Sequence, residues 1–439
     1  MAVEWRDVAL GDLFKVKHGF AFKGEFFTDQ QQSEILVTPG NFAIGGGFQD
    51  DKRKYYRGPV PTDYVLQPGQ IVVTMTDLSK QSDTLGFAAR VPNDANMWLH
   101  NQRVGLLVFN PSAEADARFV EYLLRSHEYR AWVIGSATGT TVKHTSPSRI
   151  EAFRTLVPPP SEQRAIAHIL GTLDDKIELN RRRNQTLEAM ARALFKDWFV
   201  DFGPVRAKMR GREPYLPADL WNLFPDRLDD EGRPGGWETV PASELIEFNP
   251  SEPLRKGTPA PYLDMASLPT SGSWPEPPVT RNFGSGMRFR NGDTLLARIT
   301  PCLENGKTAF VQCLPNDTIG WGSTEYIVMR PKSPVPAEYP YLLARDDAFR
   351  EHAIRSMTGT SGRQRAQGDS VAAFKLASPP DKNVWHAFAK QVMPLFESIK
   401  SNAKANETLA QLRDSLLPKL ISGELRIKDA EIFMAGANA

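Results

Sequence analysis

Several groups of residues in this sequence have the types needed for catalysis, but their spacing does not fit the chemistry. Gly306-Lys-Thr308 resembles the end of a phosphate-binding P-loop, yet Pro301 stands where that loop needs its first glycine. Asn249-Pro-Ser is the nearest match to the Asn-Pro-Pro-Tyr element of amino-methyltransferases, and it lacks the aromatic residue. The histidines are scattered, without a second His at helical spacing or a nearby Cys. The sequence therefore predicts a chain that carries no catalytic group, metal or cofactor of its own.

A second group of residues has the side chains that contact DNA. Arg pairs with guanine and Gln with adenine in the major groove, each through two hydrogen bonds. Arg363, Gln364 and Arg365 follow a Thr-Gly-Thr loop, and we expect them to read bases, with phosphate contact as the alternative. The corresponding loop in the first half is followed by Lys143 and His144, which we also expect to contact DNA.

Two further segments are candidates for DNA contact. One interleaves cations with tyrosines, which suits phosphate neutralisation, and a solvated charged loop is the alternative; its cations are Lys52, Arg53, Lys54 and Arg57. The other lies at the end of an apolar strand and comprises Arg298 and Thr300. These two correspond, within a residue or two, to Met75 and Asp77 in the first half, and we expect Arg298 and Thr300 to face DNA.

The second half of the chain repeats the order of segments in the first. The matched segments are 5–13 with 237–245, 68–74 with 291–297, 122–125 with 341–344, 138–140 with 358–360, and 152–159 with 373–380. Because the matches keep their order, they indicate a duplicated unit. Each unit mixes strand and helix signals with many Gly and Pro turns, which predicts an α/β (α+β) domain, and then continues into a long helix.

The two long helices follow proline-rich stops at 158–160 and 379–380. In the first helix Ser161 is the expected N-cap, and Glu162 lies in the first turn, where the helix dipole favours an acid. Both helices alternate three- and four-residue spacing of apolar residues around two central asparagines, as in a coiled coil whose polar residues fix the register. The expected seam residues are Leu170, Leu173, Ile177, Asn180, Asn184, Leu187, Leu194, Leu395, Ile399, Asn402, Asn406, Leu409 and Leu416.

If these helices run antiparallel, Asn184 lies opposite Asn402 and Asn180 opposite Asn406, so the polar layers pair. The alternative is that each helix packs only on its own domain. The seam from its first to its last leucine in the first helix spans about 36 Å, close to one turn of B-DNA, about 34–36 Å. We therefore expect a pseudo-two-fold chain in which two domains, separated by two long antiparallel coiled-coil helices, bind a split DNA site.

The composition is that of a globular protein without a global basic field. Lys plus Arg number 53 and Asp plus Glu number 52, so DNA contact would rest on local patches. The N-terminus lacks the apolar core of a signal peptide, and no run approaches the ~18 apolar residues of a membrane span. We expect a soluble cytoplasmic protein. The predicted segments are a first domain 1–158, a helical spacer and linker 159–236, a second domain 237–380, a distal helical spacer 381–427 and a tail 428–439.

Over essentially its whole length the sequence resembles the specificity subunit of type I restriction-modification enzymes. The segments that carry the resemblance are 158–163 at the start of the first helix, 193–206 at its end, 223–226 and 234–237 in the linker, and 417–426 near the end of the chain. The segment 379–383 departs from the pattern, because it lacks the Pro-Ser-Glu-Gln start of the first helix.

This resemblance implies a non-catalytic subunit with two target-recognition domains, each of which reads one half of an interrupted duplex DNA site. It also implies that the helices set the gap and bind two methyltransferase subunits, and that a separate motor-nuclease subunit completes the enzyme. S-adenosylmethionine, ATP and Mg²⁺ would then belong to the partner subunits. The aromatic cluster from Phe195 to Phe202 is expected to contribute to methyltransferase binding, with a place in the chain's own core as the alternative.

Two other classes of function stay open from the residues alone. One is an enzyme in which this chain itself modifies or cuts DNA, which the missing catalytic motifs disfavour. The other is a coiled-coil scaffold that does not bind DNA, which a salt-dependent shift with duplex DNA would exclude.

Overall fold

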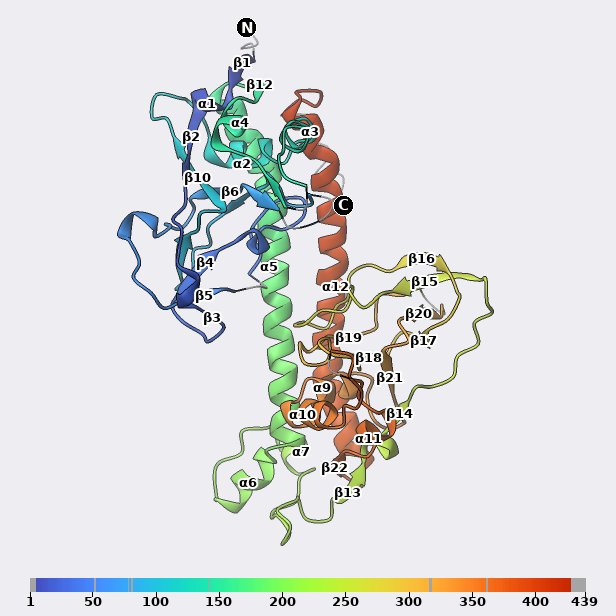
Figure 1. Cartoon of the computed structure of the whole chain (residues 1–439). Coiled ribbons are helices and arrows are strands. Elements are labelled where there is room, and N and C mark those ends of the chain that lie inside the picture. Colours follow the sequence, from blue (N-terminus) through green and yellow to red (C-terminus); the bar gives the residue numbers. More distant parts are fainter. Residues whose placement is uncertain are drawn as a thin grey trace. The chain divides into compact units, whose positions relative to one another are not determined.

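The computed structural model of the chain describes residues 5–50, 53–77, 79, 82–140, 142–315, 318–360 and 362–427. The chain forms two compact units: unit 1 is Met1–Lys176 with Thr408–Ala439, and unit 2 is Ile177–Glu407. This division cuts two long helices, α5 (Pro160–Phe199) and α12 (Lys382–Ile421), so that each unit holds part of both (Figure 1). The predicted segments instead assign each helix to a segment of its own, and the predicted tail 428–439 lies outside the described residues.

Unit 1 is a mixed α/β unit. Its strands are β1 (Arg6–Ala9), β2 (Phe14–His18), β3 (Phe27–Thr28), β4 (Glu34–Val37), β5 (Tyr55–Tyr56), β6 (Ile71–Thr74), β7 (Thr76–Asp77), β8 (Ala88–Arg90), β9 (Met97–His100), β10 (Val104–Phe109), β11 (Lys143–His144) and β12 (Arg154–Val157). Its shorter helices are α1 (Leu10–Leu13), α2 (Ala117–Leu123), α3 (His127–Gly135) and α4 (Pro147–Glu151), with 3-10 turns η1 (Gly24–Phe26), η2 (Pro39–Asn41) and η3 (Thr62–Tyr64).

The strands of unit 1 form two four-stranded sheets and two strand pairs. One sheet is antiparallel throughout, in the order β2-β10-β6-β8. The other has the order β3-β5-β4-β9, and in it β4 and β9 are parallel. The pairs are β1-β12 and β11-β7.

Unit 2 is also a mixed α/β unit. Its strands are β13 (Glu238–Pro241), β14 (Ile246–Phe248), β15 (Pro259–Leu263), β16 (Val279–Asn282), β17 (Met287–Phe289), β18 (Thr294–Ala297), β19 (Thr308–Phe310), β20 (Gly320–Gly322), β21 (Tyr326–Pro331) and β22 (Lys375–Ser378). Its shorter helices are α6 (Gly203–Met209), α7 (Ala218–Trp221), α8 (Ala242–Leu245), α9 (Tyr339–Ala344), α10 (Asp347–Arg355) and α11 (Gly368–Ala372).

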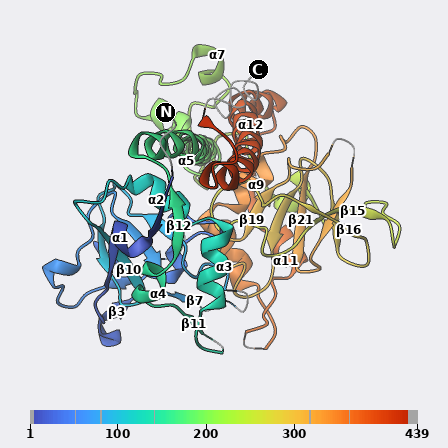
Figure 2. The same ribbon diagram turned by 90° about the horizontal axis from the view of Figure 1, so that it is seen from above.

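Unit 2 has an antiparallel sheet of order β14-β21-β18-β19 and a second sheet of order β16-β15-β20-β17, in which β15 and β20 are parallel. The strands β13 and β22 pair separately. Seen along the helices, the strands of unit 2 lie to one side of α12 (Figure 2).

The central strands β6 and β18 arise from similar local sequences. Each follows a turn whose glycine has a positive φ, 82° at Gly69 and 91° at Gly292, a conformation that glycine adopts without steric cost. All residues of both strands are buried. Burial on both faces explains why these strands are continuous apolar runs instead of alternating patterns.

The core of each unit includes its part of α5 and α12. In unit 1, Ile166, Leu170 and Leu173 of α5 pack in one cluster with Leu416 and Leu420 of α12 and with the domain. In unit 2 the corresponding cluster contains Ala191 and Phe195 to Phe199 of α5 together with Val384 to Ile399 of α12. The outer seam residues therefore belong to the domain cores as well as to the helix pair.

The start of α5 differs from the sequence-based prediction. The helix begins at Pro160, so Ser161 lies inside the first turn and its assignment as N-cap is wrong. Proline suits the first helical position because the amide hydrogen that it lacks would have no partner within the helix. The buried Gln163 then ties the helix to the domain, because its Nε2 donates to the carbonyl of Pro158 at 2.9 Å and its Oε1 accepts from the amide of Asp116 at 2.8 Å.

Within unit 2, the central asparagines of the two helices pair directly. Asn180 Nδ2 donates to Asn406 Oδ1 at 2.9 Å, and Asn402 Nδ2 donates to Asn184 Oδ1 at 2.8 Å. Residue numbers fall along α12 as they rise along α5, so these segments run in opposite directions. This is the pairing that the sequence predicts for antiparallel helices. All the predicted seam residues are buried or half-buried.

Among the described residues, we find no helix with the length and apolar character that crossing a membrane requires.

Candidate nucleic-acid interface

In unit 2 the chain brings several of the predicted DNA-contacting residues together. The chain that follows β18 pairs with the hairpin 358–365 through bridges from Arg365 to Ile299 and to Thr358. The amide of Thr300 donates to the carbonyl of Gln364 at 3.0 Å, and the amide of Ala366 donates to the carbonyl of Arg298 at 2.7 Å. Hydrogen bonds between backbones thus place these two distant segments side by side.

The Arg365 side chain is engaged within this cluster. Its guanidinium donates to both carboxylate oxygens of Glu325, at distances of 2.7–2.9 Å. The hydrogen bonds that Arg365 donates to Glu325 raise the pKa of Arg365, so its side chain keeps its positive charge. A direct contact between Arg365 and a base would require its guanidinium to leave this carboxylate.

The neighbouring cationic side chains have fewer hydrogen bonds and ion pairs than Arg365. Arg363 is exposed, and no hydrogen bond or ion pair of its side chain is found among the described residues. Arg298 is half-buried, and its Nε is buried without a hydrogen-bond partner in the described part of the chain. Because a buried N–H without a partner is costly, an incoming acceptor at this point would be favoured. Gln364, next to Arg363 in the hairpin, is half-buried.

Unit 1 has a comparable arrangement. Strand β11 pairs with β7, with Lys143 opposite Asp77 and His144 opposite Thr76. The His144 ring nitrogen Nδ1 lies 3.1 Å from Thr76 Oγ1, and a bridge joins His144 to Thr138. The hairpin that carries Lys143 and His144 therefore lies beside the end of the central strands, as the corresponding hairpin does in unit 2.

Met75 and Asp77, the counterparts of Arg298 and Thr300 in unit 1, are both only 3% exposed. The Asp77 carboxylate accepts hydrogen bonds from the amides of Ser79, Thr84 and Leu85, at distances of 2.5–3.0 Å. Burial acts to raise the pKa of Asp77, but these hydrogen bonds outweigh it and lower the pKa below 3.8. Asp77 therefore shapes the loop that follows β7.

The basic segment around β5 lies in the other sheet of unit 1. Lys52 falls outside the described residues. Arg53 forms an ion pair with Asp50, and Lys54 Nζ lies 2.8 Å from Asp29 Oδ1. Arg57 is exposed, and its side chain has no ion pair within the part of the chain that the structure describes. Of the described cations in this segment, Arg57 is thus the most available to a phosphate.

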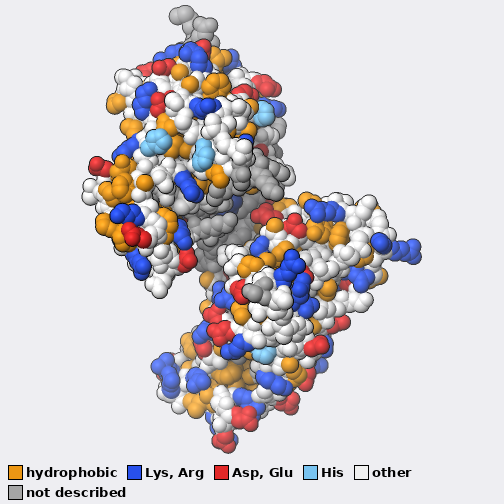
Figure 3. All heavy atoms as spheres, viewed as in Figure 1, with side chains coloured by type: hydrophobic (Ala, Val, Ile, Leu, Met, Phe, Trp, Pro, Cys, Tyr) orange, Lys and Arg blue, Asp and Glu red, His pale blue; other side chains and the backbone are white. Residues whose placement is uncertain are grey.

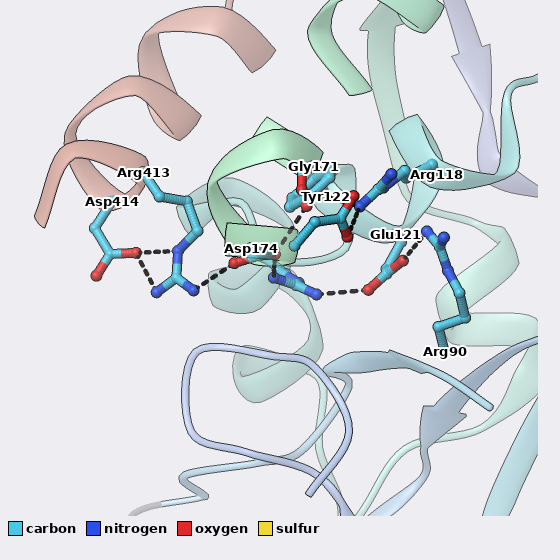
Figure 4. Close-up of polar contacts among 10 residues, drawn as sticks. Arg90, Arg118, Glu121, Tyr122, Gly171, Asp174, Arg413 and Asp414 are labelled. Carbon is cyan, nitrogen blue, oxygen red and sulfur yellow. Dashed lines mark hydrogen bonds and ion pairs between the residues drawn. The ribbon is translucent and has the colours of Figure 1, made fainter. Parts of the chain in front are cut away.

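Sequence reasoning missed a charge network that joins the unit 1 domain to both long helices (Figure 4). Asp174 of α5 accepts from Tyr122 Oη at 2.8 Å and from Arg125 at 3.1 Å, both in the domain, and from Arg413 of α12 at 2.8 Å. Arg125 continues to Glu121 at 2.6 Å. The only signal in the sequence is the acidic pair Asp174-Asp175 beside the helix seam, which cannot be told apart from a solvated pair.

The partners of Asp174 determine its charge. Burial, the largest influence, raises its pKa, but the charge of Arg125 and the hydrogen bond and charge of Arg413 outweigh that and bring the pKa below 3.8. The carboxylate is thus ionised at neutral pH and holds together three separate elements of unit 1.

Sequence reasoning also missed basic residues in unit 2, because they are far apart in the sequence. Arg255 and Lys256 precede β15, Arg281 lies on β16, and Arg288 lies on β17. Only the sheet brings them near one another.

Three aromatic residues of the cluster at the end of α5 are buried in unit 2. Phe195, Trp198 and Phe199 are 3%, 0% and 6% exposed and belong to the core of unit 2. Phe199 stacks on Trp385 of α12, with ring centroids 5.0 Å apart. For these three residues the structure supports the alternative of a place in the chain's own core, where large aromatic rings stabilise most.

The motifs considered for catalysis have structural roles in unit 2. Lys307 Nζ donates to the backbone carbonyls of Met265 and Ala266, at 2.6 and 3.2 Å, and Thr308 begins β19. The P-loop-like segment is therefore hydrogen-bonded, through Lys307, to the turn that contains Met265 and Ala266. Within the described residues, no group of three His, Cys, Asp or Glu side chains is arranged to hold a metal ion.

Known proteins with similar sequences are specificity subunits of type I restriction enzymes. Residues 2–189 match the family described as the type I restriction modification DNA specificity domain. The type I restriction enzyme HindI specificity subunit of Haemophilus influenzae is 25% identical over 390 residues, which cover 76% of this chain and 83% of that protein. The MjaIX specificity subunit of Methanocaldococcus jannaschii is 24% identical over 330 residues, 71% of this chain and 70% of that protein.

A solved structure has the same fold. The crystal structure of the type I restriction-modification system S subunit from M. genitalium superposes with a TM-score of 0.51 and 16% identity, covering 95% of this chain and 96% of that one. Residues 2–189 thus match a type I restriction modification DNA specificity domain, and over most of its length the chain is similar to type I restriction enzyme specificity subunits.

Proposed function

We propose that this chain is the DNA-specificity subunit of a type I restriction-modification complex and reads a split duplex site without catalysing a reaction itself. The observation that carries the proposal is the same in both units: a hairpin with basic residues lies beside the end of the central strands. In each case polar and basic side chains from distant segments meet on one rigid sheet edge. Loops held by a rigid scaffold are suited to base and phosphate contact.

A duplicated, pseudo-two-fold architecture is part of the proposal. The antiparallel sheets of the two units have matching strand orders, β2-β10-β6-β8 and β14-β21-β18-β19. Strands β1 and β12 pair at the edge of unit 1 as β13 and β22 do in unit 2. These correspondences support two target-recognition domains, each reading one half-site, with α5 and α12 as an antiparallel coiled coil that sets the gap.

The remaining partners follow from the family. We assign two methyltransferase subunits to the helices, and motor-nuclease subunits to the complete complex. S-adenosylmethionine, ATP and Mg²⁺ would be bound by these partners, and the complex would act on duplex DNA in the cytoplasm. Co-expression with a methyltransferase subunit followed by size-exclusion chromatography should give one copy of this chain with two of the partner. A chain that stays alone would contradict that assignment.

Mapping methylated adenines tests the proposal as a whole. Cells that carry the gene with its methyltransferase should show methylation at one split sequence, and deleting this gene alone should abolish it. Unchanged methylation after the deletion would refute the proposed function. Purified chain incubated with DNA and S-adenosylmethionine in the absence of partners should transfer no methyl group; transfer would make the chain an enzyme in its own right.

A further inference from the structure

Strands β15 and β16 form an antiparallel ribbon at one edge of unit 2. Their register runs from Pro259 opposite Asn282 to Tyr262 opposite Val279. Strand β16 is the outermost strand of its sheet, and all its residues are exposed. In Figures 1 and 2 the ribbon lies on the side of unit 2 away from α12. It is therefore an open edge of the unit.

The register separates the two faces of this sheet. Residues directly opposite one another on paired strands point to the same face. Trp321 of β20 is opposite both Tyr262 of β15 and Arg288 of β17, and Arg281 lies on the face of Val279, the partner of Tyr262. These residues share one face, which we call the ribbon face: Arg281, Tyr262, Trp321 and Arg288. The neighbouring positions Leu263 and Phe289 point the other way, into a buried cluster.

On the ribbon face two aromatic rings lie between two arginines. The Arg281 guanidinium carbon lies 4.4 Å from the centroid of the Tyr262 ring, and that ring lies 4.4 Å from Trp321. Arg288 lies over Phe283 at 5.9 Å. Stacking on a ring fixes the plane of a guanidinium and leaves its N–H groups directed outward.

The open end of the ribbon, opposite the connection between its two strands, adds more positive charge. The amide of Gly257 donates to the carbonyl of Phe283 at 2.7 Å, and the amide of Phe283 donates to the carbonyl of Thr258 at 2.8 Å, so Arg255 and Lys256 lie beside the end at which β15 begins. Both are exposed, and Figure 3 shows Lys and Arg side chains at this outer end of unit 2. Among the described residues, none of the four cations of the ribbon and its end forms an ion pair: Arg255, Lys256, Arg281 and Arg288.

We propose that the ribbon face and the ribbon end form a phosphate-contacting surface for duplex DNA, in addition to the hairpin 358–365. The proposal rests on the proposed function. Unpaired cations arranged on a rigid ribbon match the negative charge of a DNA backbone. Single-stranded nucleic acid fits less well, because its bases stack on open rings, whereas Trp321 is only 8% exposed and an arginine lies over Tyr262. The basic segment around β5 occupies the corresponding sheet of unit 1.

Salt-dependent binding of the full-length chain tests this surface. A random duplex library would first yield the sequence that the unaltered chain prefers, and that duplex would then be titrated at several salt concentrations. The double variant Arg281→Ala/Arg288→Ala should bind it at least several-fold more weakly. Its slope of log K against log[salt] should be shallower by about 0.9 for each phosphate that the variant no longer neutralises. The selected sequence should stay the same.

Two matched variants separate charge from folding. Lys375→Ala/Lys382→Ala removes the same number of charges from exposed positions elsewhere in unit 2 and should leave the slope unchanged. Arg281→Lys/Arg288→Lys keeps the charge and should keep most of the slope. If Arg281→Ala/Arg288→Ala loses its thermal unfolding transition, the salt dependence of binding would be measured with Arg255→Ala/Lys256→Ala instead, since both residues are exposed.

The outcomes distinguish failure of the ribbon surface from failure of the proposed function. If the unaltered chain selects no sequence and binds no duplex at low salt, the proposed function fails as a whole. If it selects a split sequence while the ribbon variants match the Lys375→Ala/Lys382→Ala control, only the ribbon surface is refuted. A change in the selected bases would overturn the assignment to phosphates. Normal DNA binding with loss of a co-purifying protein partner would instead make the ribbon a protein-docking edge.

Discussion

Asp174 shows how one side chain can hold several elements of unit 1 together. It accepts hydrogen bonds from the domain and from α12, and its own helix is α5. Tyr341 of unit 2 donates in a similar way to Glu188 of α5, at 2.7 Å. A domain that reads DNA at a defined distance from its neighbour must be held rigidly on its helix, and buried charge-assisted hydrogen bonds supply directional constraints that apolar contacts lack.

Replacing Asp174 should destabilise unit 1 strongly. In Asp174→Asn, Arg125 and Arg413 lose their charged partner while Arg125 stays buried, which should lower the free energy of unfolding by about 3–5 kcal/mol. Urea denaturation followed by circular dichroism would measure this. The control is Asp175→Asn, whose side chain is 67% exposed and pairs with Arg118; it should cost less than about 1 kcal/mol. Equal losses in both variants would contradict the role of the network.

The same residue makes a pH-dependent contribution. The pKa of Asp174 is lower in the folded chain than in the unfolded one. Its contribution is therefore fully present above the unfolded pKa, near pH 4, and is lost as the pH falls through the folded pKa. The difference in unfolding free energy between the unaltered chain and Asp174→Asn should be constant from about pH 5 to 7 and should shrink below about pH 4. A difference that grows on acidification would show that the pKa is raised instead.

Single substitutions in the hairpin 358–365 of unit 2 test the DNA contacts proposed for its residues. Arg363→Ala and Gln364→Ala should each cost about 1–3 kcal/mol of binding to the preferred site and relax selection in one half-site only. Arg365→Ala should act differently, because Glu325 holds that guanidinium: affinity should fall for all sequences as the hairpin loosens. Sequence selection with each purified variant measures both effects, and relaxed selection in Arg365→Ala would show that Arg365 leaves Glu325 to read a base.

At the scale of elements, α5 and α12 are joined by polar layers at their centre and by apolar cores toward their ends. The asparagine amides of the seam pair across the two helices, so a shifted register would break these hydrogen bonds. The seam therefore specifies one alignment of the helices at some cost in stability.

A double-mutant cycle on one layer tests this account. Asn180→Leu alone should destabilise the chain by about 1–3 kcal/mol, because Asn406 loses a hydrogen-bond partner within a half-buried seam. Asn180→Leu/Asn406→Leu should recover most of that stability, since both amides are then gone. The layer of Asn184 and Asn402 serves as an independent repeat. Strictly additive effects would show that the two amides do not interact.

At the scale of the whole molecule, the proposed function makes the helix pair a spacer between two half-sites. Inserting one heptad into both helices, after Asn184 and before Asn402, should lengthen it by about 10.5 Å. That length corresponds to about 3 base pairs at 3.4 Å each, so the gap should grow while both half-sites stay unchanged. Methylome mapping of the variant would measure it. Altered half-sites with the original gap would show that the helices do not set the spacing.

The sequence by itself determined the features that depend on local or periodic patterns. Strands β6 and β18, the two long helices and the pairing of Asn180 with Asn406 all follow from apolar runs, Gly turns and heptad spacing, which act over a few residues or repeat regularly. The hairpins with Lys143, His144 and Arg363 to Arg365 were found because Thr-Gly-Thr loops mark them.

Tertiary structure alone decided which polar side chains are exposed and which are buried or held by hydrogen bonds and ion pairs. Asp77 is buried and Arg365 is bound to Glu325, although both resemble free polar residues in the sequence. Phe195, Trp198 and Phe199 are buried in the core of unit 2 because they pack against α12 and the domain. The Asp174 network and the cations of the ribbon face involve residues far apart in the chain. Their contacts depend on the packing of whole elements, and no local pattern encodes that packing.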